Sequence, residues 1–347
     1  MADFQAAELV IKQAIEHGAF PGAALYVAKG GDVLFHRAFG HLSDTSPDVV
    51  TETTRFDLAS LTKVLVVATL TMRAVEQGRL CLWDKLGAFI DAPEDKQDIT
   101  LKQILTHTAG FASGLHLWQM TKNPADVTGL ILREPLAYAP GERVQYCCAG
   151  YLLLGQLLEA VYETPLDELA RREVFWPLKM MKTSYLPTGG NIAATERQPD
   201  GSYLTGVVHD ENARLLGGVA GNAGVFSTAE DVGVYLQMLA AGGLKPDGTR
   251  YLSRMSVDAM MQDETEGLEQ ARGLGLYLPW YDGGFSGDLL PRETVGHTGF
   301  TGTSFLLEPK SGLIIVLLTN RICPDRANTD IYRVRRLIAN VVAAAVE

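Results

Sequence analysis

Several features that mark particular classes of protein are scarce or absent in this sequence of 347 residues. Its apolar runs, such as residues 64–68 and 313–318, are far shorter than the ~20 residues that a membrane-spanning helix needs. Lys and Arg number 30 against 41 Asp and Glu, and this net charge of −11 argues against nucleic acid, which is bound by clustered cations. The sequence therefore predicts a protein that binds neither membranes nor nucleic acid.

Cysteine and histidine are also sparse. The four cysteines are too few for a disulfide framework, and none belongs to a CxxC pair. The seven histidines form neither HExxH nor another dense pattern of metal ligands. The sequence contains no Walker A motif, no dinucleotide-binding fingerprint and no complete GxSxG nucleophile elbow. We expect reduced thiols, no metal and no other cofactor.

The first 20 residues have the pattern of an amphipathic helix, with Asp3, Glu8, Lys12 and Glu16 among apolar positions. They lack the basic head and apolar stretch of a signal peptide. With Met1 taken as the native start, we expect a cytoplasmic protein. Nothing in the sequence indicates an oligomeric state.

Both ends of the chain have the pattern of β-hairpins. Strand-like runs over 23–28 and 32–38 are joined by Lys29-Gly30-Gly31, and a Gly pair between short apolar runs indicates a hairpin. Runs over 303–308 and 312–319 form a second pair, and helical spacing follows over 329–346. We therefore predict one antiparallel sheet, built from the two ends of the chain and flanked by terminal helices.

The middle of the chain is mostly helical. Residues 61–77 contain no Gly or Pro and stop at Gly78, and their first half is apolar nearly all round, which predicts a buried helix. Shorter helices are expected over 101–105, 124–132 and 150–161, and loops over 176–221.

The predicted fold class is therefore α/β of the α+β type. The sheet domain is discontinuous, over 1–57 and 222–347, and a mostly helical domain over 58–221 is inserted into it. The active site is expected in the cleft between the two.

A serine and a lysine stand three residues apart where the buried helix begins. Residues at this spacing share a helix face, so the Lys63 ammonium can reach the Ser60 hydroxyl. Serine is a weak nucleophile until a neighbour takes its proton, and a lysine desolvated by the apolar residues 64–67 can do so. A capping serine beside a lysine that reaches for solvent has the same spacing, so the pair alone leaves both interpretations open.

Two later motifs could complete a catalytic site. Tyr146 follows a turn and precedes a helix, and a tyrosine near a lysine can move protons because the cation lowers the pKa of the phenol. His297-Thr298-Gly299 leads into an apolar strand, where glycines allow close approach of a substrate and an exposed N–H can bind an oxyanion. A core tyrosine and a plain turn are the ordinary alternatives.

Taken in this order, the three motifs resemble the serine β-lactamase and penicillin-binding-protein superfamily, most closely the class C β-lactamase-like branch with its esterases and peptidases. That family carries Ser-x-x-Lys, Tyr-x-Asn, and Lys-Thr-Gly or His-Thr-Gly. Here the counterparts are residues 60–63, 146–148 and 297–299. The resemblance spans about residues 20–320 and implies a β-lactamase/transpeptidase-like fold.

The resemblance also implies roles for individual residues. Ser60 would be the acylated nucleophile, and Lys63 and Tyr146 would share the role of general base. The backbone N–H groups of Ser60 and Phe300 would form the oxyanion hole. Four further residues would contact the substrate, a small ester or amide: Cys148, His297, Thr298 and Gly299.

The sequence departs from the family pattern at two of these positions. Cys148 stands where the family has Asn, and a thiol is a weak donor and a weak acceptor. His297 replaces the Lys of Lys-Thr-Gly and is mostly neutral at pH 7. Both changes favour an esterase or peptidase with weak β-lactamase activity at most.

Two alternatives to a Ser60 hydrolase stay open. In one, Cys148 is the nucleophile and His297 its base. In the other, the loss of the Asn leaves a non-catalytic relative that binds penicillins or another ligand. In all three cases we expect the pocket walls in residues 111–120, 190–225 and 273–287.

Overall fold

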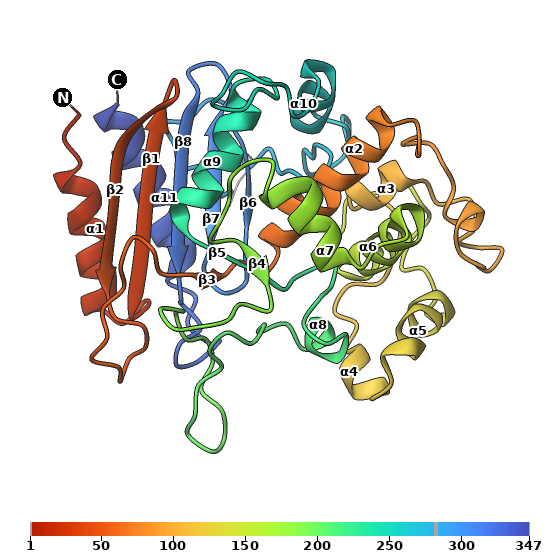
Figure 1. The fold of residues 1–347 in the computed structure, drawn as a ribbon, viewed down its shortest axis with the longest axis horizontal. Coiled ribbons are helices and arrows are strands. Elements are labelled where there is room, and N and C mark those ends of the chain that lie inside the picture. The colour runs from red at the N-terminus through yellow and green to blue at the C-terminus, as the bar shows by residue number, and fades with distance from the viewer. Residues whose placement is uncertain (1, 281–283, 347) are drawn as a thin grey trace.

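The computed structural model describes residues 2–280 and 284–346 and is built around a five-stranded antiparallel sheet (Figure 1). The strand order is β2-β1-β8-β7-β6. The first and last parts of the chain meet in its centre, where β1 pairs with β8 from Ala23 opposite Thr319 to Ala28 opposite Ile314. The predicted sheet from the two ends of the chain is thereby confirmed. Its strands are β1 (Gly22–Lys29), β2 (Asp32–Gly40), β6 (Val295–Thr298), β7 (Ser304–Glu308) and β8 (Leu313–Thr319).

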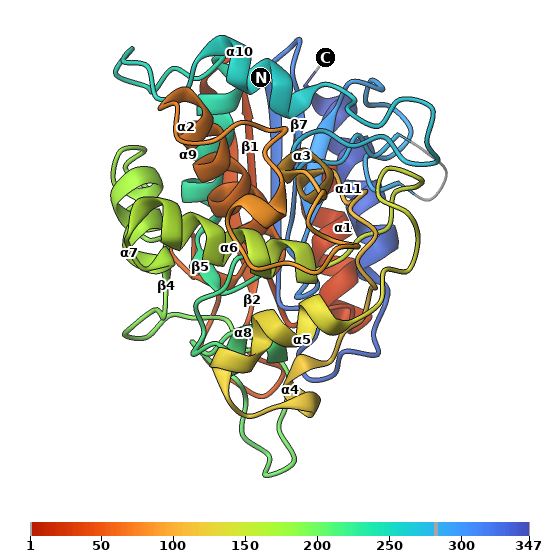
Figure 2. The ribbon, with the colours of Figure 1, turned by 90° about the vertical axis from the view of Figure 1, so that its right-hand side faces the viewer.

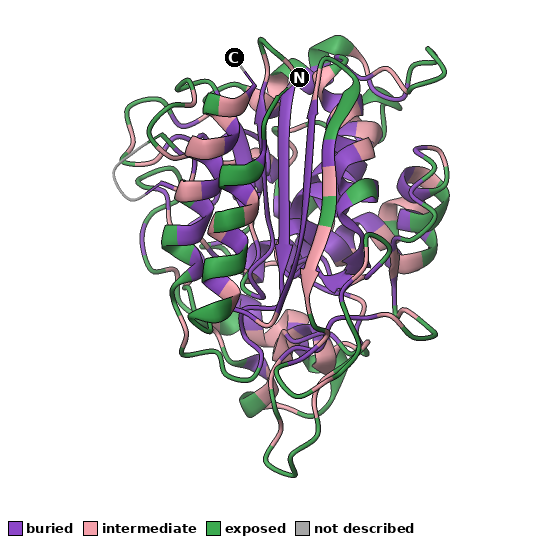
Figure 3. Cartoon of the chain, turned by 90° about the vertical axis from the view of Figure 1, so that its left-hand side faces the viewer, coloured by how far each residue is buried: buried purple, intermediate pink, exposed green. Residues whose placement is uncertain are grey.

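The sheet has a helical layer on each face. Helices α1 (Gln5–Glu16) and α11 (Ile331–Ala345) cover one face, where Figure 3 shows their buried sides turned toward the strands. Helix α9 (Ala229–Ala240) covers the other face. Every residue of β8 is buried because both of its faces are covered, which explains why its sequence is an unbroken apolar run.

A mostly helical region packs beyond α9 and occupies the side seen in Figure 2. The buried helix expected over 61–77 is present, but its first part, Lys63–Ala68, is π-helical before α2 (Thr69–Glu76) continues it. Gly78 follows in the left-handed conformation typical of a helix end. The other α-helices are α3 (Leu101–Leu105), α4 (Leu117–Met120), α5 (Val127–Arg133), α6 (Ala149–Tyr162), α7 (Leu166–Ala170), α8 (Glu211–Leu215) and α10 (Arg254–Met261). Short 3₁₀ or π segments complete the set: Leu86–Ala88, Pro124–Asp126 and Arg171–Phe175.

A second, three-stranded sheet is a feature that the sequence pattern did not predict. It has the order β3-β5-β4, with β3 (Phe56–Asp57), β5 (Val225–Ser227) and β4 (Ser184–Tyr185). Strands of two or three residues are too short for an alternating pattern to reveal them. Strand β4 and helix α8 therefore interrupt the stretch over 176–221 that was predicted as loops.

One apolar core runs from the inner face of the large sheet into the helical region, and a second fills the space under α1 and α11. The division into a discontinuous sheet domain and an inserted domain over 58–221 stays a prediction. None of the helices in the described part of the chain is long and apolar enough to cross a membrane.

Candidate active site

Ser60 lies in a tight turn between β3 and the π-helical segment. Ala59, directly before it, has a φ of +47°, a left-handed conformation that is unfavourable for a residue with a Cβ. Asp57 accepts the backbone N–H of Ala59 at 2.8 Å through Oδ1, which closes a local turn. The backbone N–H of Ser60 donates to no backbone carbonyl among the described residues. The turn thus presents both the hydroxyl and a free N–H.

Lys63 is fully buried and bonded to Ser60. Its Nζ lies 2.9 Å from Ser60 Oγ and 2.9 Å from the backbone oxygen of Asn222. It also lies 5.0 Å from the centre of the Tyr146 ring. No salt bridge within the described ranges includes Lys63. The lysine therefore reaches the serine hydroxyl in surroundings from which water is largely excluded.

Tyr146 stands at the entry to α6 with its ring on the pocket and its hydroxyl buried. Burial, followed by the neighbouring Cys148 and Tyr277, raises the pKa of Tyr146 well above its usual value, although Ser60 and Arg272 oppose part of the rise. The hydroxyl finds no partner of hydrogen-bond geometry in the described structure. Tyr146 is therefore a neutral phenol at ordinary pH, with a proton to give.

The loop after β6 is bonded to the nucleophile turn. Thr301 and Thr303 donate their side-chain hydroxyls to the backbone oxygens of Asp57 and Leu58, at 2.6 and 3.0 Å. Gly299 lies so close that a Cβ there would be 2.6 Å from the Leu58 oxygen. Phe300, between these residues, lines the same pocket as Ser60, and its N–H also donates to no backbone carbonyl among the described residues.

A buried layer of aromatic and cationic groups supports Tyr146 from behind. The Arg272 guanidinium lies 3.4 Å from the centre of the Tyr277 ring, and the His107 ring centre is 4.5 Å from that of Tyr146. Burial, reinforced by Arg272 and Lys63, lowers the pKa of His107 and that of His297 well below the usual value. Both imidazoles are therefore neutral at pH 7.

A pocket of about 420 Å³ opens above Ser60 and brings together four of the predicted residues: Ser60, Tyr146, Cys148 and Phe300. His297 was expected to contact the substrate, but it does not line this pocket. It is 1% exposed, its Nδ1 bonds to the Thr298 oxygen, and its ring packs near Tyr146 and Tyr277. Thr298 and Gly299 also stay off the pocket surface. Strand β6 runs behind the site, so of residues 297–300 only Phe300, the residue after Gly299, reaches the pocket wall.

The pocket walls follow two of the three predicted segments. They include residues 112–118 from the first, and residues 209–212 and 223 from the second. None of the described residues of 273–287 contributes, and residues 281–283 of that stretch lie outside the described structure.

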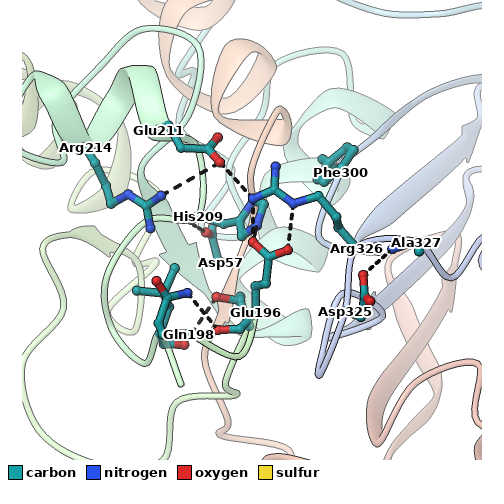
Figure 4. A network of polar contacts seen from close by, with 12 residues as sticks. Asp57, Glu196, Gln198, His209, Glu211, Arg214, Phe300, Asp325, Arg326 and Ala327 are labelled. Atoms are coloured by element: carbon teal, nitrogen blue, oxygen red, sulfur yellow. Dashed lines mark hydrogen bonds and ion pairs between the residues drawn. The ribbon is translucent and has the colours of Figure 1, made fainter. Parts of the chain in front are cut away.

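A network of charged side chains forms the wall beside Phe300 (Figure 4). Arg326 bonds to both oxygens of Glu196 and, at 2.7 Å, to Glu211. His209 Nε2 lies 3.0 Å from Glu196, and its ring stacks on that of Phe300 with centres 5.6 Å apart. Hydrogen bonds from Arg326 lower the pKa of Glu196 to about 2, so this carboxylate stays ionised.

Sequence reasoning assigned no roles to Asp57, His209, Arg272 and Arg326. Only Asp57 left a local signal, because an Asp two residues before a tight turn often accepts the N–H at that turn. The others come from distant parts of the chain and meet only in the folded protein.

A family model described as Beta-lactamase matches residues 7–340. The chain belongs to the beta-lactamase family, and the predicted membership of the serine β-lactamase and penicillin-binding-protein superfamily is confirmed. The predicted fold and the predicted enzyme class, a serine hydrolase, are confirmed with it.

Two curated relatives and one solved structure show how far the similarity extends. The chain is 30% identical to an N-acetylmuramyl-L-alanine amidase of Bacillus subtilis (strain 168), over 87% of this chain and 77% of the relative. It is 29% identical to a putative D-alanyl-D-alanine carboxypeptidase of Escherichia coli (strain K12), over 90% and 80%. A penicillin-binding protein homolog from Caulobacter crescentus superposes with a TM-score of 0.80 at 20% identity, over 99% of this chain and 97% of that one. This last likeness concerns the fold alone.

Proposed function

We propose that this protein hydrolyses small esters or amides through an acyl-enzyme formed on Ser60. The observation that carries the proposal is the 2.9 Å contact between Lys63 Nζ and Ser60 Oγ at the base of the pocket. A buried lysine in contact with a serine hydroxyl is one of the arrangements that can activate a weak nucleophile. In this contact Lys63 donates and Ser60 accepts, so the lysine must give up that proton before it can act as the base.

The first half of the reaction transfers the acyl group. Lys63 takes the proton from Ser60 as Oγ attacks the substrate carbonyl, and the backbone N–H groups of Ser60 and Phe300 receive the oxygen that becomes negative. Tyr146, a neutral phenol, passes a proton to the leaving oxygen or nitrogen and recovers one from Lys63. In the second half, water attacks the ester on Ser60, with the same groups acting in reverse.

Esters are favoured over amides by the residue at position 148. Cys148 lines the pocket and presents only a thiol, which is a weak partner for the amide group of a peptide or a β-lactam. An ester has no such N–H to satisfy. The names of the two relatives favour a second candidate, an amidase or carboxypeptidase. The class C branch and the cytoplasmic location stay predictions.

The hydrogen bonds support Ser60 over a Cys148–His297 pair. The Nδ1 of His297 is engaged with its own neighbour Thr298, and none of the hydrogen bonds in the described structure joins Cys148 to a histidine. A thiol whose base is a histidine must contact that histidine to pass its proton to it. The hydrogen bonds in the described part of the chain therefore do not support the Cys148–His297 pair.

Intact-mass spectrometry with a fluorophosphonate tests the proposal. The wild-type protein should gain one adduct, and Ser60→Ala should gain none and lose at least about 1000-fold in p-nitrophenyl ester turnover. Ser113→Ala is the matched control, because Ser113 lines the same pocket and, among the described residues, its hydroxyl bonds only to Gln145. An adduct that persists in Ser60→Ala but disappears in Cys148→Ala would show the cysteine mechanism instead. A folded wild type that binds a fluorescent penicillin but forms no adduct and turns nothing over would be a ligand-binding relative.

A further inference from the structure

We infer that Asp57 is a positioning residue that fixes Ser60 relative to the pocket wall carrying His209. This inference rests on the proposed function of Ser60 and extends it to a residue outside the three motifs. Asp57 does not line the pocket, so it acts through the groups that it holds.

The two carboxylate oxygens of Asp57 hold two different segments of the chain. Oδ1 accepts the N–H of Ala59 at 2.8 Å, and Oδ2 accepts the N–H of His209, 152 residues further along, at 2.7 Å. Asp57 is 2% exposed, so water does not compete for these bonds. A single carboxylate therefore sets the distance between the nucleophile turn and residue 209.

The first of these bonds acts on the residue before the nucleophile. Ala59 is held in the left-handed region, which a residue with a Cβ leaves unless its surroundings determine its conformation. The bond from its N–H to Asp57 is the side-chain contact that closes this turn, beside the backbone bonds from Leu61 to Leu58 and from Thr62 to Ala59. Loss of the acceptor lets Ala59 relax toward negative φ, and the Ser60 hydroxyl then moves relative to Lys63.

The second bond reaches the other half of the proposed oxyanion hole. The His209 ring stacks on Phe300, and its Nε2 is bonded to Glu196. The backbone oxygen of Asp57 also accepts the Thr301 hydroxyl, one residue after Phe300. Asp57 thus contacts, directly or through one residue, both segments whose free N–H groups would bind the oxyanion.

The charge of Asp57 faces few groups. The two N–H dipoles point at it, Asp210 repels it, and Arg214 on α8 attracts it. His209 on the same wall is neutral near pH 7, since burial lowers its pKa. Burial raises the pKa of the Asp57 carboxyl to about 6. The carboxylate is thus mostly ionised at pH 8 and becomes protonated as the pH falls through 6, when one oxygen loses much of its capacity as an acceptor.

Protonation of Asp57 has opposite effects on folding stability and on activity. Because the folded pKa lies above the ordinary value of 3.8, protonation of Asp57 favours the folded state as the pH falls. Loss of activity near pH 6 by this route therefore occurs without loss of fold from the same group.

The test compares Asp57→Asn with Asp231→Asn. Asp231 is a matched control, because it is also buried with a raised pKa and also holds a backbone N–H, that of Lys182. None of its hydrogen bonds in the described structure reaches the Ser60 turn. The rate of Ser60 labelling by a fluorophosphonate is measured from pH 5 to 8, beside thermal melting. We expect labelling to slow by about 10- to 100-fold in Asp57→Asn at pH 8, with the step near pH 6 removed, and to change less than about 2-fold in Asp231→Asn.

The labelling rates of the two variants decide whether Asp57 positions Ser60. Labelling of Asp57→Asn at the wild-type rate with the same pH dependence overturns the inference, and equal slowing in both variants shows a general effect of stability. If Asp57→Asn does not fold, Asp57→Glu replaces it. The displaced carboxylate should slow labelling by at least about 10-fold, and a wild-type rate overturns the inference. Absence of a Ser60 adduct in the wild type would instead contradict the proposed function itself.

Discussion

The side-chain hydroxyl of Thr301 donates to the backbone oxygen of Asp57 across 2.6 Å, although 244 residues separate the two in sequence. This bond joins the loop that carries Phe300 to the turn that carries Ser60. Thr303 makes the same kind of bond to the next residue, Leu58. Both acceptors are backbone atoms, at the last residue of strand β3 and the residue after it, so their positions do not depend on side-chain rotamers. The pair of threonines therefore fixes the spacing of the two N–H groups assigned to the oxyanion hole.

Gly299→Ala should lower kcat by more than the accompanying loss of folding stability can explain. A Cβ at this position would lie 2.1 Å from Thr303 Oγ1 and 2.6 Å from the Leu58 oxygen, so the loop must move away from the nucleophile turn. We expect a destabilisation of about 1–3 kcal/mol from overpacking. A displacement of about 1 Å at Phe300 should lower kcat by about 100-fold.

Denaturant unfolding and p-nitrophenyl ester turnover measure the two effects. Gly190→Ala is the control, because a Cβ there meets nothing within 4 Å and the backbone is not left-handed. If turnover in Gly299→Ala falls only as far as the fraction of folded protein falls, the close approach of the loop is not needed for the reaction.

Cys148→Asn should shift the preference of the enzyme toward amides. The variant places an amide group on the pocket wall, where the wild type has a thiol, and an amide can both donate to and accept from a peptide or β-lactam. One such contact contributes about 1–3 kcal/mol when the partner is otherwise left unpaired, so the ratio of amide to ester kcat/KM should rise at least about 10-fold.

The comparison uses matched p-nitrophenyl ester and anilide substrates, with nitrocefin as a β-lactam. Cys81→Asn changes an exposed cysteine and serves as the control. An unchanged ratio in Cys148→Asn would mean that the thiol does not select against amides.

Arg326→Met should remove a stabilising contribution that depends on pH. In the folded protein, Arg326 holds the pKa of Glu196 near 2 instead of the ordinary 4.5. A lowered carboxylate pKa stabilises the fold above pH 4.5, and this stability is lost as the pH falls toward 2. Because the Arg326 side chain is 43% exposed, solvent screens the pair, and we expect a loss of about 1 kcal/mol at pH 7.

Urea unfolding at pH 7 and at pH 3 checks this expectation. The difference between wild type and Arg326→Met should shrink at the lower pH, as Glu196 becomes protonated in the unfolded chain and then in the folded one. Arg254→Met, which removes an exposed pair with Asp258 on α10, is the control and should change little at either pH. An equal loss at both pH values would show that Arg326 stabilises through packing alone.

The secondary structure of the chain ends could be predicted because their patterns are local and long. The Gly30-Gly31 turn and the apolar run of β8 identify hairpins without tertiary information, and the structure has both. That the two hairpins share one sheet followed from their terminal positions, and the structure adds that β1 and β8 are the strands that pair. The three-stranded sheet could not be predicted, since strand β3 is two residues long and pairs with residues 226–227 of β5, which in turn pairs with residues 184–185 of β4.

Part of the candidate site was also predictable. Ser60 and Lys63 lie one helical turn apart, so their contact is a local consequence of the chain, and the motif order gave Tyr146 and the loop at 297–300. The placement of His297 was not predictable, because a histidine on a strand faces either side of it. In the folded protein the ring turns inward and packs near Tyr277, 20 residues away in sequence.

The sequence by itself thus determined the sheet of the two chain ends, the serine–lysine pair and the family. These depend on residue spacing along a helix or a strand, which a chain carries in its order of residues. Only the tertiary structure decided what surrounds that pair. Asp57 can hold His209, and Thr301 can hold Asp57, because folding brings segments 150 to 250 residues apart within hydrogen-bond distance, where burial excludes the water that would otherwise compete for those groups.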